Sequence, residues 1–261
     1  MKITRIALIF WLTFYMGCGT WIGNPENPED DTDDSSKATV DLEIVGDDTA
    51  ALASSNIDVI GASGSSIGTI TISKAIIALK EVKFELTSGS SNSKVEFEGP
   101  YIVDLLNNVT YPDPGSVQVD EGLYTKIKLK LAKVSDDDAE DAGITDTDIH
   151  DRSIYIAGTF FSTSGESKSL EMSFDFGESF EIESEDGITL ESGTSQAVQL
   201  AFKLQEWFDF SNEETNSDGY DFEDITASSI ILTDDGEDVE DELQDVIKEN
   251  IKESADMLKG D

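Results

Sequence analysis

The chain has 261 residues and carries 56 acidic side chains against 17 Lys and Arg, so its formal charge at pH 7 is −39. A charge this negative repels phosphate backbones, which excludes nucleic acid as a partner. Cys18 is the only cysteine, so the chain cannot form an internal disulfide. Its length is enough for one large or two small hydrophobic cores, which must be held together by burial alone.

The first segment, Met1–Cys18, has the order of an export signal. Lys2 and Arg5 form a short basic start, and an uncharged run follows from Ile6 to Met16. As a helix this run would cover about 16 Å, roughly half of a ~30 Å hydrocarbon layer. The segment therefore predicts a leader that is removed rather than a membrane span.

The quartet Tyr15-Met16-Gly17-Cys18 resembles the lipobox of bacterial lipoproteins. The resemblance implies that residues 1–17 are a lipoprotein signal peptide and that lipid on Cys18 anchors the mature chain to a membrane. Residues 18–37, acidic and containing two prolines, would then form a lipidated tether. Gly19 stands where an aspartate would imply inner-membrane retention, so the same resemblance implies the outer membrane. The alternative is ordinary secretion with an incidental cysteine.

Residues 38–210 alternate between apolar and polar side chains in short segments, which is the period of half-buried strands. The alternation is clearest in Val40–Ile44, Val82–Leu86, Leu123–Val134, Leu170–Phe176 and Val198–Leu204. It is lost in Ala75–Leu79, which predicts either a helical turn or a β-bulge. Short strands without helical crossovers favour a mainly β fold in which antiparallel sheets pack as a sandwich.

A row of lysines marks the strand at Leu123–Val134. Ile127, Leu129 and Leu131 face one way, and Lys126, Lys128 and Lys130 face the other. The favoured interpretation is that the lysines pair with carboxylates on neighbouring strands, and the alternative is a cationic binding patch.

The last part, residues 211–261, combines an acidic loop with an amphipathic helix. Apolar residues from Val239 to Leu258 recur at steps of three and four, which predicts one helical stripe that packs on the chain's own domain, with the groove of a partner protein as the alternative. Asp234 and Glu237 resemble a capping box before it.

The stretch Gly122–Leu129 resembles the bacterial family called domain of unknown function 4382, in which a Gly-x-Tyr-x-x-Ile-x-Leu strand follows an aspartate-leucine-leucine strand. Asp104-Leu105-Leu106 matches that earlier strand. The resemblance covers about Val40–Leu204. It implies an immunoglobulin- or transthyretin-like sandwich on a surface lipoprotein, and no known chemistry.

Two patterns invite an enzymatic interpretation. Gly64-Ser65-Ser66-Ile67-Gly68 fits the nucleophile elbow G-x-S-x-G, but a strand-like segment follows it where the elbow requires a helix. His150, the only histidine, would have to complete a triad from an acidic loop. Paired carboxylates for glycoside hydrolysis need one desolvated member, and the acids here lie in runs or alternate outward. We therefore expect no enzyme.

The acidic loop Ser135–Asp151 is a candidate calcium site, because Ca²⁺ prefers carboxylate oxygens. The proposed ligands are Asp136, Asp138, Asp146 and Asp148, and Asp218–Asp224 is a weaker second candidate. The alternative is a solvated loop that binds no metal.

Together these features predict a non-enzymatic, lipid-anchored envelope protein of the outer membrane, facing the periplasm or the cell surface. It would act in adhesion or interaction with a protein, glycan or cation ligand. The alternatives are a calcium-dependent binding module and a secreted hydrolase whose carboxylates meet only in the folded chain.

Overall fold

The computed structural model describes residues 37–46, 56–86, 94–141, 145–175, 177, 179–236 and 238–259. The chain divides into two compact units, Met1–Asp34 and Ser35–Asp261, and the described residues all belong to the second. The predicted leader, Cys18 and nearly all of the predicted tether lie outside the described residues. Within the described part, no helix is long and apolar enough to cross a membrane.

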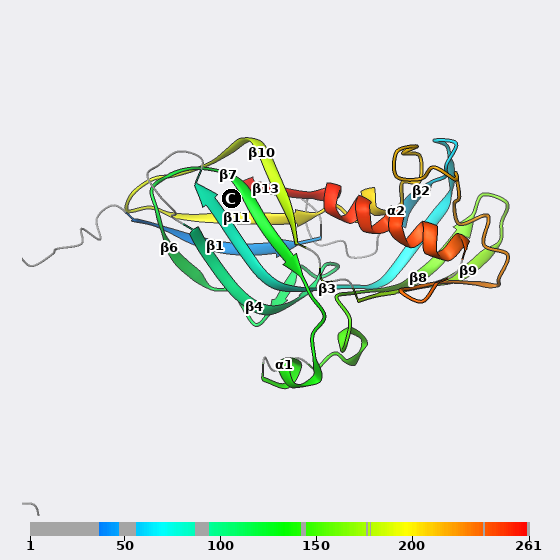
Figure 1. Cartoon of the computed structure of the whole chain (residues 1–261), viewed down its shortest axis with the longest axis horizontal. Coiled ribbons are helices and arrows are strands. Elements are labelled where there is room, and N and C mark those ends of the chain that lie inside the picture. The colour runs from blue at the N-terminus through cyan, green and yellow to red at the C-terminus, as the bar shows by residue number, and fades with distance from the viewer. Residues whose placement is uncertain are drawn as a thin grey trace, which may run out of the picture. The chain divides into compact units, whose positions relative to one another are not determined.

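Two β-sheets make up most of this unit (Figure 1). The smaller sheet has the order β13-β11-β1-β6, with β1 at Lys37–Val45, β6 at Ser116–Asp120, β11 at Ser195–Phe202 and β13 at Ala255–Lys259. The larger sheet has the path β10-β7-β3-β8-β9-β12 with β2, β4 and β5 as branches. Its strands are β2 (Asn56–Ile60), β3 (Ser66–Leu86), β4 (Lys94–Asp104), β5 (Val109–Tyr111), β7 (Gly122–Leu131), β8 (Ile154–Ser162), β9 (Ser167–Phe174), β10 (Ser179–Leu190) and β12 (Ser229–Thr233).

The helices are few and short, apart from the last. They are α1 (Asp136–Asp141), the 3-10 turns η2 (Thr147–Ile149) and η3 (Glu206–Phe208), and α2 (Val239–Ser254). The prediction of a mainly β, two-sheet fold with a C-terminal helix is confirmed. The strands are not all antiparallel, however, because β1 runs parallel to β11 and β9 runs parallel to β12.

Strand β3 is the long central strand of the larger sheet. Its first half pairs with β2 on one edge and β8 on the other, and its second half pairs with β4 and β7. Strands β4 and β8 both pair with Ile76 and Ile77, so they lie on opposite edges of β3. Along one edge β3 pairs first with β2 and then with β4. Along the other edge it pairs first with β8 and then with β7. One strand of 21 residues therefore joins two halves of the sheet, as Figure 1 shows.

The segment Ala75–Leu79 lies inside β3 as strand, so a helical turn there was the wrong alternative. Ala75–Leu79 itself pairs in regular register, and the register shifts lie on either side of it, between Ile72 and Lys74 and between Leu79 and Glu81, so the irregularity flanks the predicted segment. The alternation is lost because both faces of this segment are buried. Ala75, Ile77 and Leu79 belong to the main core, and Ile76 and Ala78 belong to a second, smaller cluster.

The second cluster is completed by the loop that connects β7 to β8. Val134, Ala139 and Ile149 pack on Ile76, Ala78 and Ile102, and half-buried Tyr155 adjoins them. We call residues 134–141 and 145–151 the acidic cap. Its apolar side chains cover the outer face of β3, while Asp136, Asp137, Asp138 and Glu140 are exposed, so this loop is not simply a solvated run of charge.

The predicted stripe on the C-terminal helix is confirmed, since Leu243, Val246, Ile247 and Ile251 of α2 are fully buried in the main core. The helix packs against η3, β12 and β10. Its boundaries differ from the prediction, because the chain leaves the helix after Ser254 and Leu258 lies in β13, paired with Gln199 of β11.

The start of α2 also differs from the expected capping box, of which Glu237 lies outside the described residues. The N-cap is Asp238, whose side chain makes no capping hydrogen bond. The Asp234 carboxylate instead accepts a hydrogen bond from Gln244 Nε2 at 2.6 Å and pairs with Lys248 Nζ at 3.2 Å. Asp234 therefore binds side chains along the helix and does not cap its N-terminus.

The lysine row of β7 pairs with neighbouring strands, as the favoured interpretation predicted. Lys126 Nζ lies 2.6 Å from Glu181 of β10, and Lys128 Nζ bridges Glu85 of β3 and Glu181 at 3.0 and 3.2 Å. The hydrogen bond from Lys126 is the main cause that holds the pKa of Glu181 below its ordinary value. These pairs join three strands across the exposed face and fix their register.

Phe222 lies at the centre of an aromatic cluster, with ring centroids 5.0 Å from Phe210, 5.5 Å from Phe160 and 6.2 Å from Phe208. We predict that Phe222→Ala lowers the free energy of unfolding by about 3–5 kcal/mol, because it removes buried apolar surface and leaves a cavity. The measurement is chemical denaturation followed by circular dichroism. As a control, Phe161→Ala on the exposed face of β8 should change it by less than about 1 kcal/mol, since Phe161 is 46 % exposed. Equal losses in the two variants would contradict the assignment of Phe222 to the core.

Candidate functional site

The sequence that fits a nucleophile elbow forms a hairpin turn instead. Gly61 and Ser65 close the turn with a 2.9 Å backbone hydrogen bond, and Ser66 begins strand β3. The Ser66 hydroxyl donates to the backbone oxygen of Gly68, whereas His150 Nδ1 lies 2.9 Å from Asp136 Oδ1 on the acidic cap. No helix follows the serine, so the strand-turn-helix geometry of the elbow is not present here.

The four proposed calcium ligands lie on the acidic cap, but they are divided among different partners. Asp146 and Asp148 meet at Lys74, whose Nζ lies 2.7 Å from Asp146 Oδ2 and 2.6 Å from Asp148 Oδ2. Asp136 contacts His150, and the Asp138 carboxylate accepts a hydrogen bond from the Ser135 hydroxyl at 2.8 Å. Across the described ranges, no three acidic, histidine or cysteine side chains converge in a way that could hold a metal ion. Calcium binding by the cap stays a prediction, and an ion would have to compete with Lys74 for two of its ligands.

Lys74 and Asp146 stabilise each other's charged forms. Burial opposes both charges, but hydrogen bonds to Asp146 and Asp148 outweigh it and raise the pKa of Lys74 above its ordinary value. For Asp146, burial is likewise outweighed by the hydrogen bonds from Lys74 and from the Asp148 backbone N–H, so the pKa of Asp146 lies below its ordinary value. Lys74 also lies over the ring of Tyr155, 5.7 Å from its centroid, which ties the ion pairs to the small apolar cluster beneath the cap.

The weaker calcium candidate, residues 218–224, has a structural role. Asp221 accepts hydrogen bonds from the backbone N–H groups of Ala62 and Glu223, and Phe222 enters the core. Among the described residues, the buried polar side chains are Ser, Asn and Gln, and none is Asp or Glu. Glu242 of α2 is half-buried, and burial, helped by the charges of Asp218, Asp245 and Asp241, raises its pKa above the ordinary value. Glycoside hydrolysis needs such a group opposite a second carboxylate in a cleft, and Glu242 lines neither of the two hollows described below.

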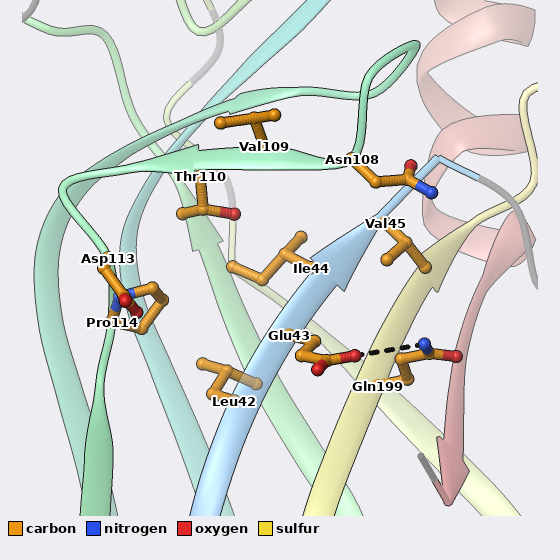
Figure 2. A pocket seen from close by; sticks show the side chains of 10 residues that line it. All are labelled: Leu42, Glu43, Ile44, Val45, Asn108, Val109, Thr110, Asp113, Pro114 and Gln199. Carbon is orange, nitrogen blue, oxygen red and sulfur yellow. Dashed lines mark hydrogen bonds between the residues drawn. The ribbon is translucent and has the colours of Figure 1, made fainter. Parts of the chain in front are cut away.

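The best candidate site is a groove between the ends of β1 and β5, with a volume of about 440 Å³. It is lined by Leu42–Val45 of β1, by Asn108, Val109 and Thr110 at the start of β5, by Asp113 and Pro114, and by Gln199 of β11. Figure 2 shows the Ile44 side chain in the space between β1 and β5, with Thr110 directed toward it from β5. This volume is in the range of ligand-binding clefts. We call it the β1–β5 groove.

The turn before β5 closes one end of the groove. The Asp104 carboxylate accepts hydrogen bonds from the backbone N–H groups of Leu106 and Asn107 and so shapes the β4–β5 turn. The Asn108 side-chain oxygen in turn accepts a 2.9 Å bond from the backbone N–H of Gly46. A Cβ at Gly46 would lie 2.0 Å from the Leu105 oxygen, so only glycine lets β1 end this close to the turn.

The loop between β5 and β6 forms the other end. The Asp113 carboxylate accepts a hydrogen bond from the backbone N–H of Gly115, which has a positive φ of 67° and turns the chain into β6. Strand β6 pairs with β1 only as far as the Asp41–Ser116 position. Beyond it, Leu42–Val45 pair with β11 on one edge, and no described strand pairs with their other edge.

The directions of the backbone hydrogen bonds along β1 show which backbone groups face this open edge. Thr39 donates its N–H to Thr194, on the β11 side, whereas Leu42 N–H points to Gly115 O on the β6 side, at a long distance of 3.5 Å. Because backbone groups of successive residues point to opposite edges, the N–H and C=O groups of Leu42 and Ile44 face the groove. The Leu42 N–H on this edge is bonded to Gly115, so the Leu42 C=O and the N–H and C=O of Ile44 are the groups that no described strand pairs, and they belong to residues that are only 4 % and 2 % exposed.

The groove is anionic. Glu43 and Asp113 are exposed, and among the lining residues, all of which the structure describes, there is no Lys, Arg or His. Gln199 Nε2 donates to Glu43 Oε2 at 3.2 Å, which holds the carboxylate beside the open edge (Figure 2). A basic ligand would meet complementary charge here.

A second hollow of about 310 Å³ lies on the solvent side of α2, between Thr215 and the helix. Two lysines of α2 line it, and each has a carboxylate partner: Lys248 pairs with Asp234 and Lys252 with Glu249. These pairs give the hollow a structural explanation, so we regard the β1–β5 groove as the better site.

Sequence reasoning did not find the groove, because its lining residues come from segments far apart in the chain. The signal that was available is the run Tyr111–Gly115, rich in turn-forming residues, which marks where the strand beside β1 stops. Thr110 and Gln199 carry no pattern that would separate them from other residues of exposed strands.

The Lys74 ion pairs generate a pH-dependent prediction. We expect Lys74→Met to lower the free energy of unfolding by about 1 kcal/mol at pH 7, since half-exposed ion pairs contribute little each. The difference from the wild-type protein should shrink as the pH falls below about 4, because the stability from a depressed carboxyl pKa is present above the unfolded value and lost as the carboxylate is protonated. Urea denaturation between pH 7 and pH 3 measures it.

The matched control is Lys133→Met, which removes one exposed pair with Asp175. It should cost less than about 0.5 kcal/mol at every pH. A Lys74→Met loss that did not change with pH would mean that the lysine acts through packing instead of charge.

Comparison of the chain with protein-family models, with curated proteins and with solved structures gives no match. The resemblance of Gly122–Leu129 to domain of unknown function 4382 therefore stays a prediction. The function must be argued from the residues and their arrangement.

Proposed function

We propose that this protein is a non-enzymatic, lipid-anchored protein of the outer membrane that binds a ligand in the β1–β5 groove. Cys18 would hold it to the bilayer through attached lipid, and the acidic segment that follows would separate the folded unit from the membrane. The folded unit would supply the interaction surface.

The observation that carries the binding part of the proposal is the groove itself. It combines a volume of about 440 Å³, an unpaired edge on β1 and two exposed carboxylates, Glu43 and Asp113. Such a hollow is rigidly framed, because Gly46 and Asn108 close one end and Pro114 stands at the other. Convergent polar groups in a preformed cleft are typical of binding sites.

The anchoring part of the proposal rests on the sequence of residues 1–37. A short basic start, an uncharged run too short to span a bilayer and a lipobox-like quartet support lipid attachment at Cys18. The charge of −39 supports the same arrangement, since so anionic a domain is repelled by anionic membrane surfaces and needs lipid to remain there.

We predict that the mature protein begins at Cys18 and that its N-terminal peptide carries acyl chains. Mass spectrometry of the protein purified from membranes measures both. Cys18→Ser should lose the lipid mass, because the hydroxyl cannot replace the thiol as the acceptor. A matched Thr20→Ser variant, two residues away, should keep it.

A second arm tests whether the lipid is the anchor. Protein that begins at Gly19, exported behind the cleaved leader of a secreted protein, should appear in the soluble fraction. An unmodified Cys18 thiol in the wild-type protein, or a Gly19 form that sediments with membranes, would contradict the proposal.

A further inference from the structure

We propose that the ligand of the β1–β5 groove is an extended, basic peptide segment of a partner protein, which pairs as an added strand with the open edge of β1. This inference rests on the proposed function, because it uses the same groove, and it names the ligand class and the mode of recognition. Strand addition at an exposed sheet edge gives affinity through backbone hydrogen bonds and specificity through alternate side chains.

The backbone of β1 supplies the first argument. Over Lys37–Asp41 the strand is paired on both edges, by β11 and by β6. From Leu42 onward β6 has ended; the Leu42 N–H still donates to Gly115 O at 3.5 Å, and the Leu42 C=O and the N–H and C=O of Ile44 face the groove without a strand partner. An added strand would continue the line of β6 and pair with the same edge. At about 3.3 Å per residue, Leu42–Val45 gives room for a strand of about four residues.

The two walls of the groove supply the second argument. An added strand would send alternate side chains to opposite faces of the smaller sheet. One set would enter the space between the sheets, against Ile44 and Thr110, where only small or apolar side chains fit. The other set would lie on the outer face beside Glu43 and Gln199. The expected ligand therefore alternates apolar and basic residues.

Charge decides which chain can occupy the groove. Glu43 and Asp113 favour a basic segment and disfavour an acidic one. Residues 18–37 of this same chain contain six acids and one lysine at the end, Lys37. A second copy of a chain with charge −39 is also repelled. The complementary occupant is thus a segment of another protein.

The probe for the test is an acetylated and amidated octapeptide that alternates valine and lysine, labelled with a fluorophore. We expect saturable binding to the full-length protein at 0.15 M salt by fluorescence anisotropy. Because a basic peptide also binds any acidic surface weakly, the informative control is a peptide of identical sequence and charge that carries an N-methyl group on every residue. It has no intact edge for pairing and should bind at least tenfold more weakly.

A second peptide, N-methylated on alternate residues only, keeps one edge free and should bind within about threefold of the parent. Hydrogen exchange gives a direct structural readout. Addition of the parent peptide should slow the exchange of the Ile44 amide, which faces the open edge, and the fully blocked peptide should not.

Charge reversal on the protein tests the position. Glu43→Lys and Asp113→Lys should each weaken binding at least fivefold. Asp58→Lys, a control with the same charge change at an exposed position of β2 outside the groove, should change it less than twofold. All three positions are exposed, and an unchanged unfolding midpoint will show that each variant is folded.

Two outcomes would overturn the inference in different ways. If the blocked peptide binds as tightly as the parent while Glu43→Lys still weakens binding, strand addition is wrong and the groove remains the site. If Glu43→Lys, Asp113→Lys and Asp58→Lys bind alike, the peptide lies elsewhere and both the strand addition and the groove are wrong. Neither outcome bears on lipid attachment at Cys18, which has its own test.

Discussion

The structure depends on the burial of β3 on both of its faces at Ala75–Leu79. A strand of this length crosses from one half of the larger sheet to the other, so its middle cannot keep one face in water without exposing Ile76 and Ala78. The acidic cap meets this requirement with only three apolar side chains, Val134, Ala139 and Ile149. Because the cap has so little apolar surface, the ion pairs of Lys74 with Asp146 and Asp148 help to hold it in place.

The pairing of β3 with β4 also explains where the groove lies. The β4–β5 hairpin belongs to the second half of β3, and its turn reaches across to the end of β1 through Asn108 and Gly46. The chain then needs the loop Tyr111–Gly115 to travel from the larger sheet to the smaller one, where it begins β6. That crossing leaves the last residues of β1 without a partner on one edge. The open edge follows from the topology and from the length of the loop.

Several elements could be predicted from the sequence because their signal is local. Val40, Leu42 and Ile44 of β1 are buried as their alternation indicates, and so is the stripe from Leu243 to Ile251 on α2. The pairing of Lys126 and Lys128 with Glu181 follows from the same alternation, given that the chain has 56 acidic side chains against 17 Lys and Arg. Periodicity reports which face of an element is buried, and it does so without knowledge of the neighbours.

Other features depend on contacts between distant residues, which periodicity cannot report. Apolar and polar residues alternate in the same way in parallel and antiparallel strands, so the sequence pattern did not predict that β1–β11 and β9–β12 are parallel pairs. Leu258 continues the helical spacing of α2 and yet lies in a strand, because β11 offers it an edge immediately after Ser254. The burial of Ala139 and Ile149 could not be predicted, because acids surround them in the sequence of the cap. Their burial depends on contacts with Ile76 and Ala78, more than fifty residues earlier. The groove lies in this second class, since each of its walls comes from a different part of the chain.

The distribution of lysine explains why the groove keeps its negative charge. Lys83, Lys126 and Lys128 bind glutamates on the exposed face of the larger sheet, Lys74 holds the acidic cap, and Lys248 holds α2 to Asp234. These five lysines are held in structural pairs, and none of the residues that line the groove is Lys, Arg or His. Glu43 instead accepts a hydrogen bond from neutral Gln199, which orients its carboxylate without neutralising it. A strand edge and an oriented carboxylate that forms no ion pair with a described residue thus occur at the same place, and a partner that supplies both backbone pairing and a cation would satisfy both.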